Sequence, residues 1–410
     1  MTLAEAAAGP QSVVVIGAGP AGFSAAAELR QRGFTGTIQL LDPAGLPHDR
    51  PPLSKAYLAG TLNEAGIALA APDWFRENSV QLVADTAVSI TPDEGKVALA
   101  GGSELQADAL VLATGGTARA PRFPGAGLIH TLRTKADADA LRAQLGPGRK
   151  LVIIGAGLIG AEVASTAAAL GTAVVLIDPV PVPLVPAVGE ELAAYLHRMH
   201  ADAGVRTITG LPVDVVPEPT GYSVVLDDGS LIDADAVLAA IGMAPDAALA
   251  EAAGIAVDGG VLVDAAGRTS HPRVFAAGDS TRRSISGVHS RRSEHWDAAV
   301  RSGRAAAAGL LGQEPDEEAV PWFWTDRYGV HAEAVGSMDA EGQTVERRSP
   351  GPGYMVFRIA PDGTLAGAAG VDAGPALRAV RRLIALKKPV SAEQLADPAT
   401  DLRRLVRSRP

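Results

Sequence analysis

The chain contains no cysteine among its 410 residues. This absence excludes disulfide bonds, thiolate metal sites and any redox or nucleophilic chemistry at a cysteine side chain. It also excludes an iron–sulfur cluster held by protein thiolates in the usual way. Chemistry at protein thiols is therefore ruled out.

A net positive charge and a long apolar run are also missing. The formal net charge is −10, which argues against a general nucleic-acid binder, because such proteins neutralise phosphates with Lys and Arg. No apolar run approaches the ~20 residues that span a bilayer. The first residues, "MTLAEAAAGP", carry an acid and no basic segment, so they make a poor secretory signal. We expect a short disordered lead over residues 1–9 and a cytoplasmic protein.

A glycine-rich turn near the N-terminus lies between a predicted strand and a predicted helix. The apolar run Ser12–Ile16 predicts a buried parallel strand, an Ala-rich helix follows to about Arg32, and a second strand over Thr37–Leu41 ends at Asp42. Between the first strand and the helix, "GAGPAG" has the G-x-G-x-x-G spacing, with Gly17, Gly19 and Gly22. Such glycines let the backbone approach a pyrophosphate at a helix N-terminus, and the acid accepts hydrogen bonds from ribose hydroxyls.

The same pattern occurs a second time. In "KLVIIGAGLIGAEVASTAAALGTAVVLID" a strand is followed by Gly155, Gly157 and Gly160, a helix, and a strand that ends at Asp178. Small antiparallel meanders are expected after each copy, followed by the similar stretches "ADALVLATGG" and "ADAVLAAIGMAPD". Two matched copies predict two dinucleotide-binding domains.

A third element indicates how the two copies are joined. "HPRVFAAGDS", residues 271–280, predicts a strand that returns to the first domain and ends near Asp279. The remainder, from about Pro321, predicts a sheet with a basic helix from Pro375. The fold class is therefore α/β, with two Rossmann-like domains and a C-terminal α+β domain. The predicted boundaries are 1–116 and 244–320 for the first domain, 117–243 for the inserted second domain, and 321–410 for the last.

Eight motifs together make the chain resemble the ferredoxin reductase family of FAD- and NADH-dependent flavoproteins. They are "GAGPAG", "RPPLSKAYLAG", "LVLATGG", "LRT", "IIGAGLIGAEVA", "FAAGDS", "EHWDAA" and "PWFWTDRYG". The resemblance covers nearly the whole chain. It implies a glutathione reductase-like frame, FAD on the first domain, NADH on the second, and electron delivery to a small [2Fe-2S] ferredoxin that feeds an oxygenase.

The resemblance also assigns FAD contacts. It implies that Asp42 binds the adenosine ribose, that Val88 lies beside the adenine, and that Asp279 meets the ribityl chain. Lys55 and Arg133 match flavin and pyrophosphate contacts, and Trp296 matches a residue that lies against the flavin. The remaining positions assigned to FAD are Arg50, Thr114, Glu294 and His295, in addition to Gly17, Gly19 and Gly22 of the first turn.

Lys55, Glu162 and Trp296 are the predicted catalytic residues. Pro51 and Pro52 restrict φ and lower the entropy cost of ordering the segment that carries Lys55. A fixed cation at the isoalloxazine edge favours the reduced flavin. The positive N-terminal end of a helix beginning near Glu294 is expected to add to this effect.

Two acids are assigned to NADH. Glu162 matches a family acid that meets the nicotinamide carboxamide, although a helix residue satisfied by a neighbouring turn is an equally good interpretation. Asp178 favours NADH, because a carboxylate binds the ribose 2′-hydroxyl and repels a 2′-phosphate. Many family members carry an arginine in the segment that follows, and Val182 replaces it here.

An acidic ferredoxin requires a basic docking face, and two groups of bases meet this requirement. One group is predicted beside the flavin and the other on the C-terminal domain; they are Arg282, Arg283, Arg291, Arg292, Arg301 and Arg304, and Arg378, Arg381, Arg382, Lys387 and Lys388. Solvated helix faces are an equally good interpretation. Rubredoxin reductase, NADH oxidase and a redox switch of the apoptosis-inducing-factor type remain alternatives for the whole protein. Oligomeric state is not indicated.

Overall fold

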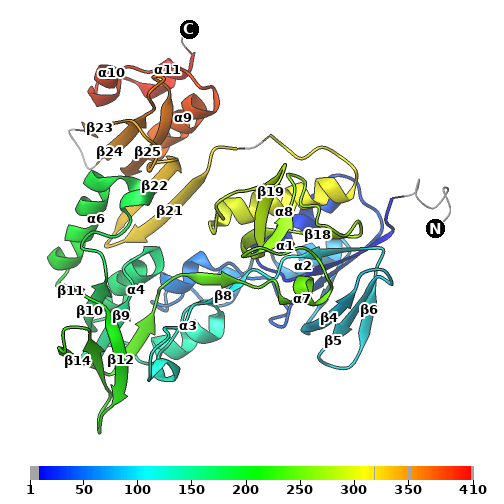
Figure 1. Cartoon of the computed structure of the whole chain (residues 1–410), viewed down its shortest axis with the longest axis horizontal. Coiled ribbons are helices and arrows are strands. Elements are labelled where there is room, and N and C mark those ends of the chain that lie inside the picture. The colour runs from blue at the N-terminus through cyan, green and yellow to red at the C-terminus, as the bar shows by residue number, and fades with distance from the viewer. Residues whose placement is uncertain (1–8, 318, 350–352, 408–410) are drawn as a thin grey trace. The chain divides into compact units, whose positions relative to one another are not determined.

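The computed structural model describes residues 9–317, 319–349 and 353–407, so the predicted N-terminal lead lies almost wholly outside the described residues. The described chain divides into two compact units. Unit 1 comprises residues 9–51, 63–117 and 243–317, and unit 2 comprises residues 52–62, 118–242 and the described residues from 319 onward. Each unit is therefore built from segments that are far apart in the sequence (Figure 1).

A five-stranded parallel sheet forms the centre of unit 1, in the order β18-β7-β1-β2-β3. Its strands are β1 (Ser12–Ile16), β2 (Thr37–Leu41), β3 (Val80–Val83), β7 (Ala109–Leu112) and β18 (Val274–Ala276). The bounds predicted for the first two strands are confirmed. The predicted return of the 271–280 segment is also confirmed, since β18 pairs with β7.

Helices cover one face of this sheet and small strands cover the other. The helices α1 (Pro20–Gln31) and α8 (Trp296–Leu310) share a core with the sheet that includes Leu29 and Phe275. On the opposite face lies the meander β4 (Ala87–Thr91), β5 (Lys96–Leu99) and β6 (Glu104–Gln106). The remaining elements of unit 1 are η2 (Ala65–Ile67), α2 (Pro72–Glu77), β8 (Gly116–Ala118), β16 (Met243–Pro245), α7 (Ala248–Ala252), β17 (Val261–Val263), η4 (Gly278–Ser280), β19 (Thr281–Ile285) and β20 (Val288–His289).

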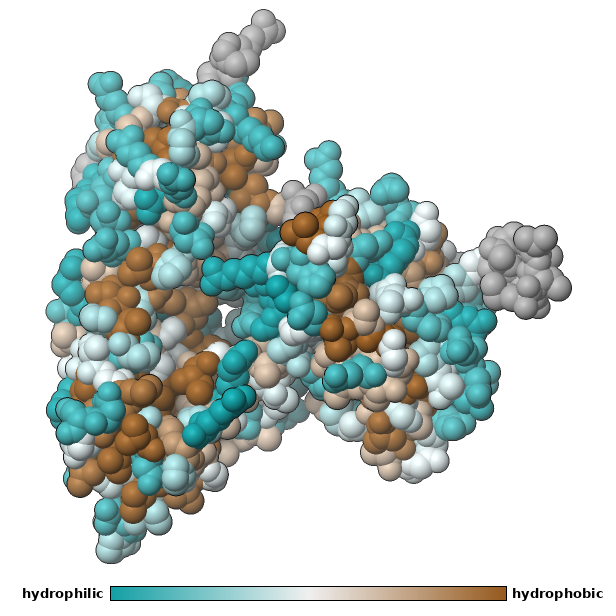
Figure 2. Space-filling model, in the orientation of Figure 1, coloured by the Kyte–Doolittle hydropathy of each residue, from teal (hydrophilic) through white to brown (hydrophobic). Residues whose placement is uncertain are grey.

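Unit 2 contains the second parallel sheet, in the order β11-β10-β9-β15. Its elements are η3 (Ala126–Leu128), α3 (Lys135–Arg142), β9 (Lys150–Ile154), α4 (Leu158–Ala169), β10 (Ala173–Asp178), α5 (Val185–Val188), α6 (Glu190–Asp202), β11 (Arg206–Thr209) and β15 (Ala236–Ala239). The meander β12 (Pro212–Pro217), β13 (Tyr222–Leu226) and β14 (Leu231–Ala234) packs on one face through a core that includes Val215 and Val224. Leu231 on β14 and Leu211, directly before β12, are exposed. Apolar residues reach the surface in several places (Figure 2).

The C-terminal part of unit 2 is an antiparallel sheet in the order β21-β22-β25-β24-β23. Its elements are β21 (Trp322–Arg327), β22 (Val330–Gly336), β23 (Gln343–Arg348), β24 (Tyr354–Ile359), β25 (Leu365–Val371), α9 (Gly374–Ala385), α10 (Ala392–Ala396) and α11 (Leu402–Arg407). The three helices cover one face. The other face packs against α5 and α6, with Leu192 and Leu196 in contact with the sheet. This shared core explains why the second nucleotide domain and the C-terminal sheet form one unit.

The segment 52–62, which carries Lys55 and part of η1 (Pro51–Ser54), packs with unit 2. Tyr57 is 5% exposed, and its hydroxyl donates to Asp139 Oδ1 over 2.8 Å. Lys135 binds the other oxygen of Asp139 at 3.0 Å. The sequence-based domain ranges place this segment in the range 1–116.

A test of the fold follows from the close packing of α1 and α8. A Cβ at Gly303 would overlap the carbonyl oxygen of Ala21. We expect Gly303→Ala to lower the free energy of unfolding by about 1–3 kcal/mol, because neither helix backbone can move away without disturbing the sheet core. Gly127→Ala is the matched control, since a Cβ there meets no atom within 4 Å. Urea unfolding measures both variants, and equal losses would show that the helices do not depend on this approach.

Candidate functional site

In the first glycine turn, Gly17 and Gly22 lie tightly against neighbouring backbone, whereas Gly19 lies on the open side of the turn. Gly17 has φ +100°, and a Cβ there would overlap the carbonyl oxygen of Ala113. A Cβ at Gly22 would overlap the carbonyl oxygen of Gly17. At Gly19 the nearest atom to such a Cβ is Arg50 Nη2, at 3.8 Å. A cation therefore lies over the open side of the turn, at the start of α1, where a pyrophosphate fits.

Asp42 is held in place at the end of β2. Its Oδ2 accepts a hydrogen bond from Ala18 N over 2.9 Å, and its Oδ1 accepts one from Ala44 N over 2.9 Å. Its own N–H donates to Val83 O at the end of β3, over 3.0 Å. Val88, the predicted adenine neighbour, lies on β4 at a register irregularity and is 56% exposed.

The second glycine turn repeats this geometry. A Cβ at Gly160 would overlap the carbonyl oxygen of Gly155, whereas one at Gly157 would meet no atom within 4 Å. Asp178 Oδ2 accepts from Ala156 N over 2.8 Å, and its Oδ1 accepts from Val180 N over 3.0 Å. The open glycine and the oriented carboxylate fit a second dinucleotide. Val182 packs into the core under α6, so it is a packing residue.

The other predicted contacts of unit 1 surround the beginning of α8. Trp296 Nε1 donates to Asp49 Oδ1 over 2.9 Å. His295, the residue before the helix, has a lowered pKa because it is partly buried, against the opposing charges of Asp279 and Asp297. Thr114 directly follows β7 and Ala113, and its hydroxyl donates to Asp246 O over 2.6 Å. Sequence reasoning missed Asp49, although it directly precedes the "RPPLSK" motif.

Arg292 connects two further predicted contacts. Its Nη1 donates to the Asp279 backbone oxygen over 3.4 Å, and its Nη2 lies 2.6 Å from Glu294 Oε1. Arg133 lies in unit 2, where its backbone N–H donates to Asp137 in the capping box of α3. The structure thus brings together the glycine turn, Asp42 and Arg50 in unit 1, while Lys55 and Arg133 belong to unit 2.

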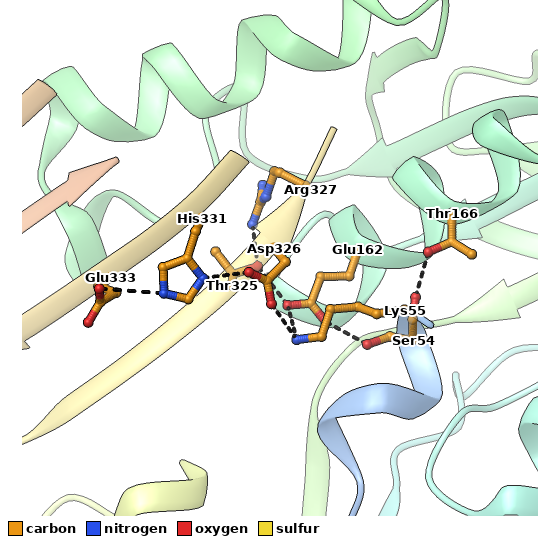
Figure 3. Close-up of polar contacts among 9 residues, drawn as sticks. All are labelled: Ser54, Lys55, Glu162, Thr166, Thr325, Asp326, Arg327, His331 and Glu333. Carbon is orange, nitrogen blue, oxygen red and sulfur yellow. Dashed lines mark hydrogen bonds and ion pairs between the residues drawn. The ribbon is translucent and has the colours of Figure 1, made fainter. Parts of the chain in front are cut away.

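Glu162 is the centre of a polar cluster in unit 2 (Figure 3). It lies on α4 and is 5% exposed. Ser54 Oγ donates to its Oε2 over 2.5 Å, Thr325 Oγ1 donates to its Oε1 over 2.7 Å, and Lys55 Nζ lies 3.4 Å from Oε1. Thr166 fixes the Ser54 segment by donating to the Ser54 backbone oxygen over 2.8 Å. Glu162 is therefore bound by residues distant in sequence and not by a neighbouring turn.

Lys55 is shared between two acids. Its Nζ lies 3.2 Å from Asp326 Oδ2, closer than to Glu162, and 5.6 Å from the ring centroid of Trp324. The imidazole of His331 extends the cluster: Nδ1 is 2.5 Å from Asp326 Oδ1, and Nε2 is 3.4 Å from Glu333. Burial would raise the pKa of the Asp326 carboxyl, but His331 and Lys55 outweigh burial and hold it below its usual value.

Comparison with known proteins agrees with the two glycine-turn domains and with the C-terminal sheet. Residues 11–303 match the family model described as pyridine nucleotide-disulphide oxidoreductase, and residues 322–406 match the model described as reductase C-terminal. The chain belongs to the pyridine nucleotide-disulphide oxidoreductase family, and within it to the ferredoxin–NAD(+) reductases. It is an oxidoreductase whose cofactors are FAD and NADH, and its cysteine-free sequence excludes disulfide chemistry at protein thiols.

Curated relatives and solved structures support this placement over the full length. The ferredoxin–NAD(+) reductase component of the anthranilate 1,2-dioxygenase system from Burkholderia cepacia is 38% identical, with 95% of this chain and 98% of the relative covered. Putidaredoxin reductase from Pseudomonas putida is 35% identical, with 96% of each chain covered. The structure of the covalent putidaredoxin reductase–putidaredoxin complex matches with a TM-score of 0.89 at 32% identity, covering 97% of this chain and 98% of that chain. Within the described ranges, no helix is both long and apolar enough to cross a membrane.

A buried histidine beside the cluster generates a test of stability against pH. His200 on α6 is 1% exposed, and its Nδ1 lies 2.7 Å from the Tyr328 hydroxyl. Burial, with the charges of Arg327 and His197, lowers its pKa from 6.5 to about 3. Below pH 6.5 the imidazole is protonated in the unfolded chain but stays neutral in the folded chain. The contribution of His200 to the free energy of unfolding is therefore fully present above pH 6.5 and is lost as pH falls toward 3.

We expect this one group to cost about 2 kcal/mol of unfolding free energy between pH 7 and pH 5. His200→Gln keeps a partner for Tyr328 but does not titrate, so its loss over the interval should be smaller by that amount. Urea unfolding at the two pH values measures the difference, in which all other titrations cancel. Parallel losses in the two proteins would contradict the lowered pKa.

Proposed function

We propose that the protein carries electrons from NADH through FAD to a small [2Fe-2S] ferredoxin that serves an oxygenase. The balanced reaction oxidises one NADH to NAD⁺, reduces two ferredoxins and releases one proton. The observation that carries the proposal is the repeated arrangement of glycine turn and oriented carboxylate in a chain without cysteine. Full-length similarity to reductase components of dioxygenase systems supports the ferredoxin as acceptor.

FAD is assigned to unit 1. Gly17, Gly19 and Gly22 make room for its pyrophosphate, Arg50 supplies a cation, and Asp42 accepts from the ribose. We assign the adenine neighbour to Val83 rather than Val88, because Val83 meets the backbone of Asp42. Thr114, Asp279, Glu294, His295 and Trp296 stay assigned to the flavin part. For Lys55 and Arg133, which belong to unit 2, the assignment to FAD rests on the family resemblance alone. When bound, FAD accepts a hydride and releases electrons one at a time.

NADH is assigned to unit 2. Gly155, Gly157 and Gly160 make room for its pyrophosphate, and Asp178 accepts from the ribose 2′-hydroxyl. Glu162 serves the nicotinamide carboxamide: a carboxylate offers about four acceptor positions, and Ser54, Thr325 and Lys55 use three. Lys55 acts as a cation beside this acid, and Asp326 holds it there.

The docking face is assigned mainly to α9. Four arginines of the predicted group beside α8 are paired with acids: Arg282 with Asp258, Arg292 with Glu294, Arg301 with Asp297 and Arg304 with Glu28. Among the described residues, the exposed Arg378 and Arg382, one turn apart on α9, form no such ion pair. An unneutralised pair of cations attracts an acidic ferredoxin more strongly than paired ones.

The activity and its docking face are tested together by NADH-driven ferredoxin reduction. We expect turnover with an acidic [2Fe-2S] ferredoxin to fall steeply between low and high salt, because screening removes steering, while NADH-to-ferricyanide turnover barely changes. Arg378→Gln with Arg382→Gln should flatten this salt dependence, and Arg282→Gln is the paired control. Absence of turnover with any small iron–sulfur protein, combined with a long-lived reduced flavin, would favour the redox-switch alternative; turnover with rubredoxin or oxygen alone would favour the other two.

Asp178 should decide the coenzyme. Its charge opposes a 2′-phosphate by an upper estimate of about 3 kcal/mol, so we expect NADH to be preferred by roughly a hundredfold in kcat/KM. Asp178→Asn keeps the acceptor for the Ala156 N–H and removes the charge, and should reduce the preference to about tenfold or less. Steady-state rates with NADH and NADPH, using ferricyanide as acceptor, give the ratio. An unchanged ratio would place the ribose elsewhere.

A further inference from the structure

Arg327 at the end of β21 is a buried cation with few partners. Its side chain belongs to a residue that is 3% exposed. Its Nη2 donates to Thr325 Oγ1 over 3.3 Å, and its Nε is buried without a partner. Among the described residues, its side chain forms no ion pair with a carboxylate. Burying a charge in this way costs stability, so a structural role alone does not account for it.

Within the part of the chain that the structure describes, the Arg327 side chain forms one hydrogen bond, to Thr325, which in turn contacts Glu162 (Figure 3). Thr325 Oγ1 accepts from Arg327 and donates to Glu162 Oε1 over 2.7 Å. A hydroxyl has one hydrogen, and a guanidinium can only donate. Because Arg327 occupies an acceptor position of this hydroxyl, the hydrogen of Thr325 is directed to the carboxylate.

Charge acts in the same direction as geometry. Burial lowers the pKa of Arg327, and the negative charge of Glu162 opposes that effect. Lys55, the direct cation of Glu162, is shared with Asp326 and lies closer to it. Arg327 is therefore the second positive charge that acts on Glu162, from within the protein interior, where screening by water is weak.

We propose that Arg327 and Thr325 are positioning residues of the nicotinamide site, which fix the Glu162 carboxylate so that one acceptor position stays directed to the carboxamide. This inference rests on the proposed role of Glu162. Ser54 donates to Oε2 of the carboxylate and Thr325 donates to Oε1. The contact with Arg327 keeps the Thr325 hydroxyl in place, so both oxygens of Glu162 are fixed and the carboxylate cannot rotate freely. The C-terminal domain thereby contributes to coenzyme binding as well as to the proposed docking.

The test uses the purified full-length holoprotein and four variants. Arg327→Met removes the charge at similar length, Thr325→Val removes the hydroxyl, Thr325→Ser retains it, and the double variant combines the first two. The readouts are the Kd of NAD⁺ by calorimetry, kcat and KM for NADH with ferricyanide, FAD content and Tm. Arg347→Met is the matched control: this buried arginine of the same domain donates to the backbone oxygens of Pro398 and Thr400.

We expect Arg327→Met and Thr325→Val each to raise the Kd of NAD⁺ and the KM for NADH about tenfold, as for a hydrogen bond to a charged group. Thr325→Ser should stay within about twofold. The double variant should lose no more than either single variant, because both residues act through one hydrogen bond to Glu162. Arg327→Met should keep or raise the Tm, whereas Arg347→Met should lower the Tm and leave Kd and KM unchanged.

Two results would overturn the inference: losses of Arg327→Met and Thr325→Val that multiply in the double variant, or an Arg327→Met protein with lower Tm and unchanged Kd. Glu162→Gln separates this failure from failure of the proposed function. If Glu162→Gln weakens NAD⁺ binding while Arg327→Met does not, only the positioning role is wrong. If Glu162→Gln leaves NAD⁺ binding unchanged, the assignment of Glu162 to the carboxamide is wrong, and the positioning role fails with it.

Discussion

Both nucleotide modules depend on one close approach between a helix and the turn that precedes it. In each module the third glycine of the turn lies against the carbonyl oxygen of the first, at Gly22 and Gly17 and again at Gly160 and Gly155. Any side chain there would push the helix away. This approach also aims one backbone N–H, of Ala18 or Ala156, at the acid that ends the second strand. Room for a pyrophosphate and an oriented carboxylate therefore have one cause.

The polar cluster around Glu162 has a different origin, because packing between domains assembles it. The sheet of the C-terminal domain packs on α5 and α6, and its first strand, β21, runs beside α4. Tyr57 and Asp139 fix the segment that carries Ser54 and Lys55. A buried carboxylate thus receives hydroxyl donors from two directions, at the expense of an arginine buried with few partners. Buried charged groups that lower stability in this way are common at functional sites.

Sequence patterns predicted much of the fold and the part of the site that is local. The strands Ser12–Ile16 and Thr37–Leu41 have the predicted bounds, since a continuous apolar run closed by glycine or an acid defines them. Charge counts alone could not predict which arginines of the proposed docking groups form ion pairs. In the structure Arg282 pairs with Asp258 and Arg292 with Glu294. Asp49 was not predicted, because its contact is with Trp296, a residue far along the chain.

The sequence by itself determined the two nucleotide modules and the absence of thiol chemistry, because each is encoded in residues that are contiguous or simply counted. Only the tertiary structure decided what surrounds Glu162. Its partners Ser54 and Thr325 lie 108 and 163 positions away along the chain. No periodicity or spacing specifies such contacts, which form only when α4, the 52–62 segment and β21 are brought together by the burial of their apolar neighbours.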